Sequence, residues 1–128
     1  MAAETDALNA MIAHLRAIPD LVQSALPECA AECKAVIAEN IAAQRGPDGT
    51  PWQPGAKGQP VLEDAVSAVE AIATGNTILI RVSGIEAKHH FGFVRGKIAR
   101  PIIPTRKAPQ PMTKAIERVI MRRLAAGK

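Results

Sequence analysis

Two segments rich in proline and glycine divide this 128-residue chain into parts that can form regular structure. Residues 46–60 hold four Gly and four Pro, and residues 101–111 hold four Pro. Proline lacks a backbone N–H, and glycine weakens helices and strands, so neither segment favours a regular element. We therefore predict long loops or arms at 46–60 and 95–111, within a single domain spanning residues 1–128.

The part before the first loop has apolar residues at helical spacing. A first stripe predicts a helix over about residues 5–17, which Pro19-Asp20 interrupts. Asp20 is also a good N-cap for a helix that follows. A second stripe, from Val22 to Ile41, predicts a longer helix over about 21–44, which Pro27 either kinks or restarts. The first stripe consists of Leu8, Met11, Ile12, Leu15 and Ile18.

The part between the loops is expected to contain a small sheet. Residues 62–73 fit either a helix or a strand that enters a hairpin turn at Thr74-Gly75-Asn76. The run Thr77–Val82 is β-rich and predicts a strand, and we interpret residues 87–94 as the start of another extended segment. After the second loop, apolar spacing predicts a final helix over about 112–125.

This order of elements predicts an α+β fold, with helices packed on a small antiparallel sheet. Only 2% of the residues are aromatic, so the core must be built from Ala, Val, Ile and Leu. No apolar run is long enough for a membrane span, and acidic residues occupy the N-terminus where a secretion signal needs basic ones.

Charge is distributed unevenly along the chain. Residues 1–86 carry a net charge of −6, whereas residues 87–128 carry +10 from eleven Lys and Arg against Glu117. The basic part could contact DNA, an acidic partner or the acidic part of a neighbouring copy. Equally, folding could interleave the two parts into an ordinary charged surface.

Cys29 and Cys33 stand one helical turn apart within the apolar stripe, where free Cys behaves as a small hydrophobic residue. No short CxxC spacing typical of structural zinc is present, and a disulfide across one helical turn is disfavoured. We therefore predict no metal, no cofactor and no disulfide. His89 and His90 would point to opposite faces of a strand and could not hold one ligand together.

The sequence contains no HExxH, GxSxG or P-loop motif, and we predict that the protein is not an enzyme. Binding to the DNA backbone, without sequence specificity, is the alternative that the basic C-terminal part favours. Single-strand binders stack bases on aromatic residues, and this part offers only Phe91 and Phe93. A helix-turn-helix in the N-terminal half is disfavoured because that half is acidic.

Trp52 is the only Trp and lies within the first loop. One interpretation is that it folds back and caps the helical core. The other is that it anchors a partner subunit, since aromatic residues are common at the centres of interfaces.

Three segments resemble the virion-morphogenesis (tail-completion) family of long-tailed bacteriophages. The run Gln44–Trp52 resembles the Pro-Asp-Gly-Thr-Pro-Trp signature that follows a long N-terminal helix in that family. Ala87–Gly92 resembles its Ala-x-x-His-x-Phe-Gly segment, and Ala99–Pro104 resembles its Pro- and Arg-containing stretch before the final helix.

The resemblance implies a structural role at the head–tail junction, in the neck or upper tail of the virion, after assembly in the host cytoplasm. Its implied partners are further copies in a ring, sixfold like the tail, the tail terminator or tail tube protein, and a head-completion protein. The implied surface would tolerate passing DNA without reading it, and no membrane is involved. The candidate assembly contacts are Trp52, His89, His90, Phe91, Arg95, Lys97, Arg100 and Arg106.

Overall fold

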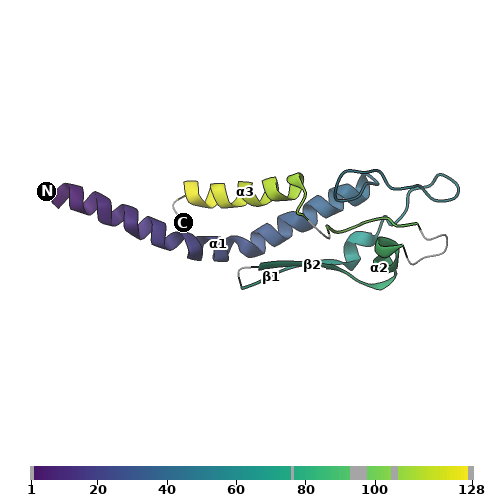
Figure 1. Ribbon diagram of the computed structural model, residues 1–128, viewed down its shortest axis with the longest axis horizontal. Helices are drawn as coiled ribbons and strands as arrows, with labels where there is room; N and C mark the ends of the chain where they lie inside the picture. The colour runs from purple at the N-terminus through teal and green to yellow at the C-terminus, as the bar shows by residue number, and fades with distance from the viewer. Residues whose placement is uncertain (1, 76, 93–97, 105–106, 127–128) are drawn as a thin grey trace.

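The computed structural model describes residues 2–75, 77–92, 98–104 and 107–126, and within them it has three α-helices, a short 3-10 helix and a two-stranded antiparallel sheet. Figure 1 shows an elongated molecule in which the longest helix runs along most of its length. The predicted α+β class is therefore confirmed. The elements are α1 (Ala2–Ala42), η1 (Ala65–Ala68), β1 (Val69–Thr74), β2 (Thr77–Val82), α2 (Gly84–Phe91) and α3 (Gln110–Ala125).

A single helix, α1, forms the N-terminal third, so the prediction of two helices was wrong. The helix continues through Pro19-Asp20 and through Pro27. Interior proline removes one N–H···O=C bond and its ring crowds the carbonyl of residue i−4, which can kink a helix without ending it. Figure 1 shows α1 changing direction between its two halves, which is the usual consequence of internal proline.

The strands β1 and β2 form a hairpin, which confirms the strand interpretation for residues 69–74 and the predicted strand at 77–82. Gly75 in the connecting turn has a φ of 61°, a conformation that glycine adopts without strain. The register pairs Val69 with Val82 and Thr74 with Thr77. Residues 65–68 form the 3-10 turn η1, so only this short part of the ambiguous region is helical.

Residues 84–91 form the helix α2, so the prediction of an extended segment over 87–94 was wrong for residues 87–92, and residues 93 and 94 lie outside the described residues. Ser83 has extended backbone angles at the N-cap, and Gly92 ends the helix in the left-handed region with a φ of 76°. These are ordinary signals for a helix start and stop, and Glu86, Ala87 and Lys88 between them are good helix formers. Because α2 is helical, His89 and His90 do not lie on opposite faces of a strand.

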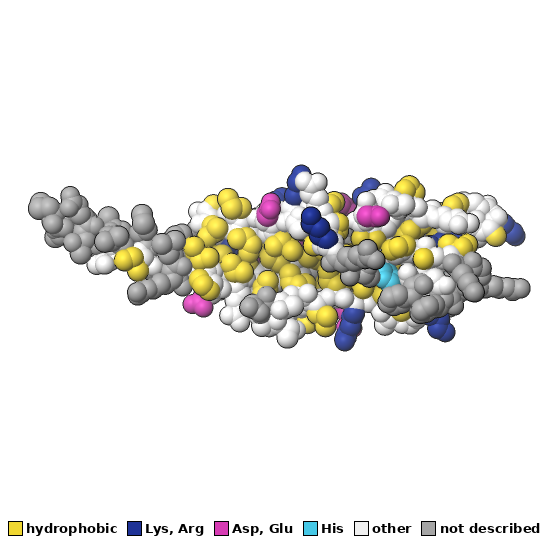
Figure 2. Space-filling view, in the orientation of Figure 1, with side chains coloured by type: hydrophobic (Ala, Val, Ile, Leu, Met, Phe, Trp, Pro, Cys, Tyr) yellow, Lys and Arg dark blue, Asp and Glu magenta, His cyan; other side chains and the backbone are white. Residues whose placement is uncertain are grey.

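The core lies where α1, α3 and the hairpin meet. The helix α3 runs antiparallel to α1 and packs along its C-terminal half, and it begins two residues before the predicted start at residue 112 (Figure 1). Figure 2 shows the hydrophobic side chains gathered between α3 and the hairpin. The core contains two clusters of buried apolar residues. Cys33, Ile37 and Val69 are almost fully buried in the larger cluster, and Val119 is almost fully buried in the smaller one.

Apolar side chains also reach the surface. The exposed large hydrophobic residues among those described include Ile72 and Leu79, which face each other across the hairpin. No helix in the described part of the chain combines the length and the apolar composition that crossing a lipid bilayer requires.

Candidate functional site

The C-terminal end of α1 passes into a tight turn. Gln44 has a φ of 58°, which ends the helix, and the backbone N–H of Gly46 donates to the carbonyl of Thr50 over 2.9 Å. Asp48 Oδ1 accepts a hydrogen bond of 2.9 Å from the Thr50 backbone N–H, and this bond lowers the pKa of the exposed Asp48 carboxyl. Residues 46–60 contain turns and an isolated bridge residue at Pro51, but neither helix nor strand.

Trp52 lies in the core of its own chain. Its side chain is only 7% exposed and belongs to the same buried cluster as Ile37, Ile41 and Ile102. The indole N–H donates a hydrogen bond of 2.8 Å to the carbonyl of Pro101, 49 residues further along. Of the two interpretations of Trp52, docking onto the chain's own core is therefore the one that describes this structure.

Arg100 is also buried, with 6% of its surface exposed. Its Nε donates to the carbonyl of Gln53 over 2.8 Å, and a terminal nitrogen donates to the carbonyl of Pro54 over 3.3 Å. Its backbone N–H donates to the carbonyl of His89 over 2.9 Å. The guanidinium thus ties the first loop to the second through main-chain oxygens, and it is not presented to a partner.

His90 joins α2 to the second loop. The ring is 5% exposed, and its Nδ1 accepts a hydrogen bond of 2.9 Å from the backbone N–H of Ile102. Burial lowers the pKa of His90, which keeps the imidazole neutral and Nδ1 available as an acceptor. His89 is partly exposed, and among the described residues its buried Nδ1 has no hydrogen-bond partner.

The three segments that carry the family resemblance therefore meet in one place. We name the group formed by Trp52, His90, Arg100, Pro101 and Ile102 the junction. Its hydrogen bonds connect the loop after α1, the last turn of α2 and the stretch before α3. Figure 1 shows these three parts of the chain at the same end of the molecule.

The other candidate contacts divide differently. Arg95, Lys97 and Arg106 lie outside the described residues, as does the Phe91 side chain, although Phe91 is the last residue of α2. Of the candidates whose side chains are described, only His89 is partly accessible to a partner.

Sequence reasoning missed Gln44 as a side chain that organises the first loop. Its amide nitrogen donates to the carbonyl of Val61 over 2.8 Å, and its amide oxygen accepts from the Val61 N–H over 2.7 Å. The same nitrogen donates to the carbonyl of Ile41 over 3.0 Å. Gln44 begins the first motif segment, but no local pattern indicates a partner 17 residues away.

A groove of about 1170 Å³ lies beside the junction. Its walls are the end of α1, the turn at 47–49, and residues within 101–104 and 107–113. Prolines form much of this lining, and Arg45, Asp48 and Lys107 contribute charge.

The two cysteines lie where the apolar stripe placed them. Both thiols are free and buried in the second half of α1. Desolvation by burial raises the pKa of Cys33 to about 11 and also raises that of Cys29, so both stay protonated. Across residues 2–75, 77–92, 98–104 and 107–126, no group of three His, Cys, Asp or Glu side chains is placed to hold a metal ion.

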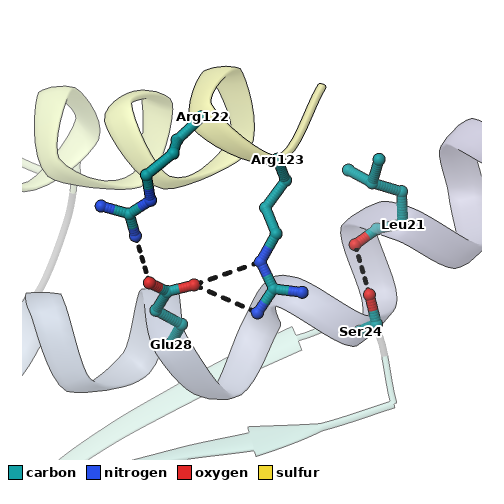
Figure 3. Close-up of polar contacts among 5 residues, drawn as sticks. All are labelled: Leu21, Ser24, Glu28, Arg122 and Arg123. Carbon is teal, nitrogen blue, oxygen red and sulfur yellow. Dashed lines mark hydrogen bonds and ion pairs between the residues drawn. The ribbon is translucent and has the colours of Figure 1, made fainter. Parts of the chain in front are cut away.

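Folding joins the acidic and basic parts of the sequence at one point. Glu28 of α1 accepts hydrogen bonds from Arg122 and from Arg123 of α3, the latter over 3.1 Å, as Figure 3 shows. The interleaving of the two charged parts that the sequence left open therefore occurs here. Other basic side chains of α3, including Lys114 and Arg118, stay exposed.

No family model, no curated protein and no solved structure matches this chain.

Proposed function

We propose that this protein is a structural component of the head–tail junction of a long-tailed bacteriophage, a tail-completion protein that forms a ring. In this role it joins the tail tube to head-completion proteins and performs no turnover. The observation that carries the proposal is the convergence of all three resemblance segments on the junction. The motif residues hold one another in place. Residues of this kind are expected to be common to a family whose members share a structural scaffold, whereas members that share a reaction would have catalytic groups in common.

The junction supports the proposal physically because it gives the loops a defined shape. Trp52 and Arg100 fix the first loop to the second, and His90 fixes the second loop to α2. A loop that is already ordered loses little conformational entropy when it docks onto a neighbour. The parts of the first loop beyond these anchors, such as Lys57 and Gln59, are exposed and available to contact one.

The elongated shape supports contacts with more than one neighbour. The junction lies at one end of the molecule, and the N-terminal part of α1 extends beyond α3 at the other (Figure 1). Contacts between different surfaces of identical subunits are heterologous, and such contacts close into a ring when the rotation permits. Exposed basic residues on α3 and exposed acidic residues such as Glu39, Glu63 and Asp64 provide opposite charges for them.

The proposal is tested by deleting the coding sequence in frame from the phage or prophage that encodes it. We expect DNA-filled heads and separate tails in electron micrographs, no infectious particles, and restoration by the wild-type protein supplied from a plasmid. A tagged copy should label the neck or upper tail of purified particles. Infectious, normally joined particles made without the protein would contradict the proposal.

A basic DNA-associated protein is the alternative, and the exposed Lys107, Lys114 and Arg118 are the observation that favours it. Binding through phosphates weakens steeply with salt, so affinity for duplex DNA measured over a salt series separates the two functions. We expect weak binding without sequence preference. Tight binding with a steep salt slope, together with absence of the protein from particles, would favour the alternative.

A further inference from the structure

The outward face of the hairpin carries two large aliphatic side chains. Ile72 and Leu79 face each other in the register and are 40% and 48% exposed. On the same face Glu70 pairs with Arg81, whose Nε donates to the carboxylate over 2.6 Å. Each strand thus presents one large aliphatic side chain and one charge, acidic on β1 and basic on β2.

Both long edges of this hairpin are open in the described part of the chain. The Ser83 N–H donates to the Ala68 carbonyl, and hydrogen-bonded pairs alternate with non-hydrogen-bonded pairs in an antiparallel ladder. Glu70 and Arg81 therefore form a hydrogen-bonded pair, whereas Ala71 with Ile80 and Ala73 with Ile78 do not. The backbone groups of Ala71 and Ala73 on β1, and of Ile80 on β2, therefore point away from the partner strand. These three residues make no backbone hydrogen bond to any described residue outside the hairpin.

We propose that these edges pair with a second copy of this chain, β1 of one copy lying antiparallel beside β2 of the next. Edge strands with free N–H and C=O groups are templates for such pairing. The pairing extends each two-stranded hairpin into a larger sheet, and two strands alone are marginal.

The charges select this arrangement over one that joins identical edges. With β1 beside β2 of the neighbouring copy, Glu70 gains a second arginine, Arg81 of the neighbouring copy, and the Ile72–Leu79 row continues across the contact. Oppositely charged cross-strand neighbours are stabilising, whereas like charges directly opposite are destabilising. Pairing β1 with β1 would give Glu70 no arginine across the contact, and pairing β2 with β2 would give Arg81 no carboxylate.

A contact between two different edges is heterologous, so each copy keeps one open edge for the next copy. This inference rests on the proposed function for its ring and adds the surface through which neighbouring copies bind. One face of the sheet is already covered by α1, so the new strand adds at the edge without displacing any described element.

Cross-linking tests the pairing with two separate variants, Ile72→Cys and Leu79→Cys. Both positions are exposed, and the native thiols of Cys29 and Cys33 are buried and protonated, so mild oxidation should form disulfides between the new thiols only, and only where they lie on adjacent strands. The full-length proteins are used at concentrations where sedimentation detects oligomers. We expect cross-linked dimers when the two variants are mixed and none with either variant alone.

Controls make the result specific. Met121→Cys is a matched exposed position, 63% exposed on α3, and should cross-link with neither hairpin variant. Thermal unfolding of all three variants should match the wild type. Cross-linking of Ile72→Cys or of Leu79→Cys by itself would overturn the proposed arrangement, as would a monomer at every concentration or an oligomer without cross-links in the mixture.

The two proposals fail separately. Cross-links between the mixed variants, combined with normal particles after deletion of the coding sequence, would leave the edge pairing standing and remove the phage function. The reverse outcome would leave a phage protein whose copies bind through another surface.

Discussion

Replacing Trp52 with alanine removes the largest side chain that connects the first loop to the core. The side chain is 7% exposed, packs with Ile37, Ile41 and Ile102, and donates a hydrogen bond to the Pro101 carbonyl. Truncating a buried Trp costs about 3–5 kcal/mol, and loss of the hydrogen bond is included in a cost of that order. A domain of this size has roughly 5–15 kcal/mol of stability, so a large part of it depends on this residue.

The change is measured by circular dichroism during thermal and urea unfolding, because Trp52 is the only Trp and the alanine variant has no indole fluorescence. At about 3–5 °C per kcal/mol for a domain of this size, we expect the midpoint to fall by roughly 10–20 °C. Trp52→Phe is the matched control. It keeps an aromatic ring but removes the N–H that binds Pro101, so its loss should be clearly smaller than that of Trp52→Ala.

A loss below about 1 kcal/mol for Trp52→Ala would refute the reasoning, since surface substitutions have effects of that size. It would mean that Trp52 does not hold the loop in the isolated protein, and the anchor interpretation would then regain its place. A stable variant that fails to join heads to tails would support that interpretation directly.

Three further predictions concern the core, the junction and the surface. Changing Cys29 and Cys33 together to alanine should cost about 1–3 kcal/mol in urea unfolding, and protein purified without added metal should contain no stoichiometric zinc; bound zinc would contradict their role as core residues. Because burial lowers the pKa of His90, the unfolded chain binds a proton at this residue more readily than the folded chain does. The neutral, buried His90 therefore contributes its full stability above pH 6.5, and this contribution is lost as the pH falls through the folded pKa. Unfolding at pH 7.5 and 5.5 should show this loss, and His90→Asn, whose amide oxygen can accept from Ile102, should reduce it; an unchanged pH dependence would contradict the role. Glu28→Gln should lower the free energy of unfolding by about 1 kcal/mol or less, since two arginines bind a partly exposed carboxylate. This loss of stability should be smaller in high salt, which screens the ion pairs. A loss that does not change with salt would show that the ion pairs contribute little.

Periodicity alone determined the elements whose signals are local. The stripe containing Cys29 and Cys33 placed both thiols in the core, and the β-branched run from Thr77 to Val82 indicated a strand. The final helix was found to within two residues of its start at Gln110. These succeed because helix and strand formation depend on neighbours within a few positions, which the sequence shows directly.

Local rules failed where packing competed with them. Pro19 predicts a helix end by local rules, but α1 runs through it, because an interior proline can bend a helix instead of ending it. Residues 87–94 follow a strand and contain two aromatic residues, which favours an extended segment, yet the extended Ser83 and the left-handed Gly92 bound a short helix there. Both outcomes depend on a sum of contacts that no single propensity contains.

The junction was decided only by the tertiary structure. The sequence singled out Trp52, His90 and Arg100 as candidate contacts with other molecules, although folding back onto the core was one of the two interpretations of Trp52. Folding instead brings them onto partners in the chain that are 49, 12 and 47 residues away. The partners are backbone carbonyls and an N–H that every residue carries, so the sequence holds no mark that identifies them, and only the path of the chain in space selects which ones lie within reach.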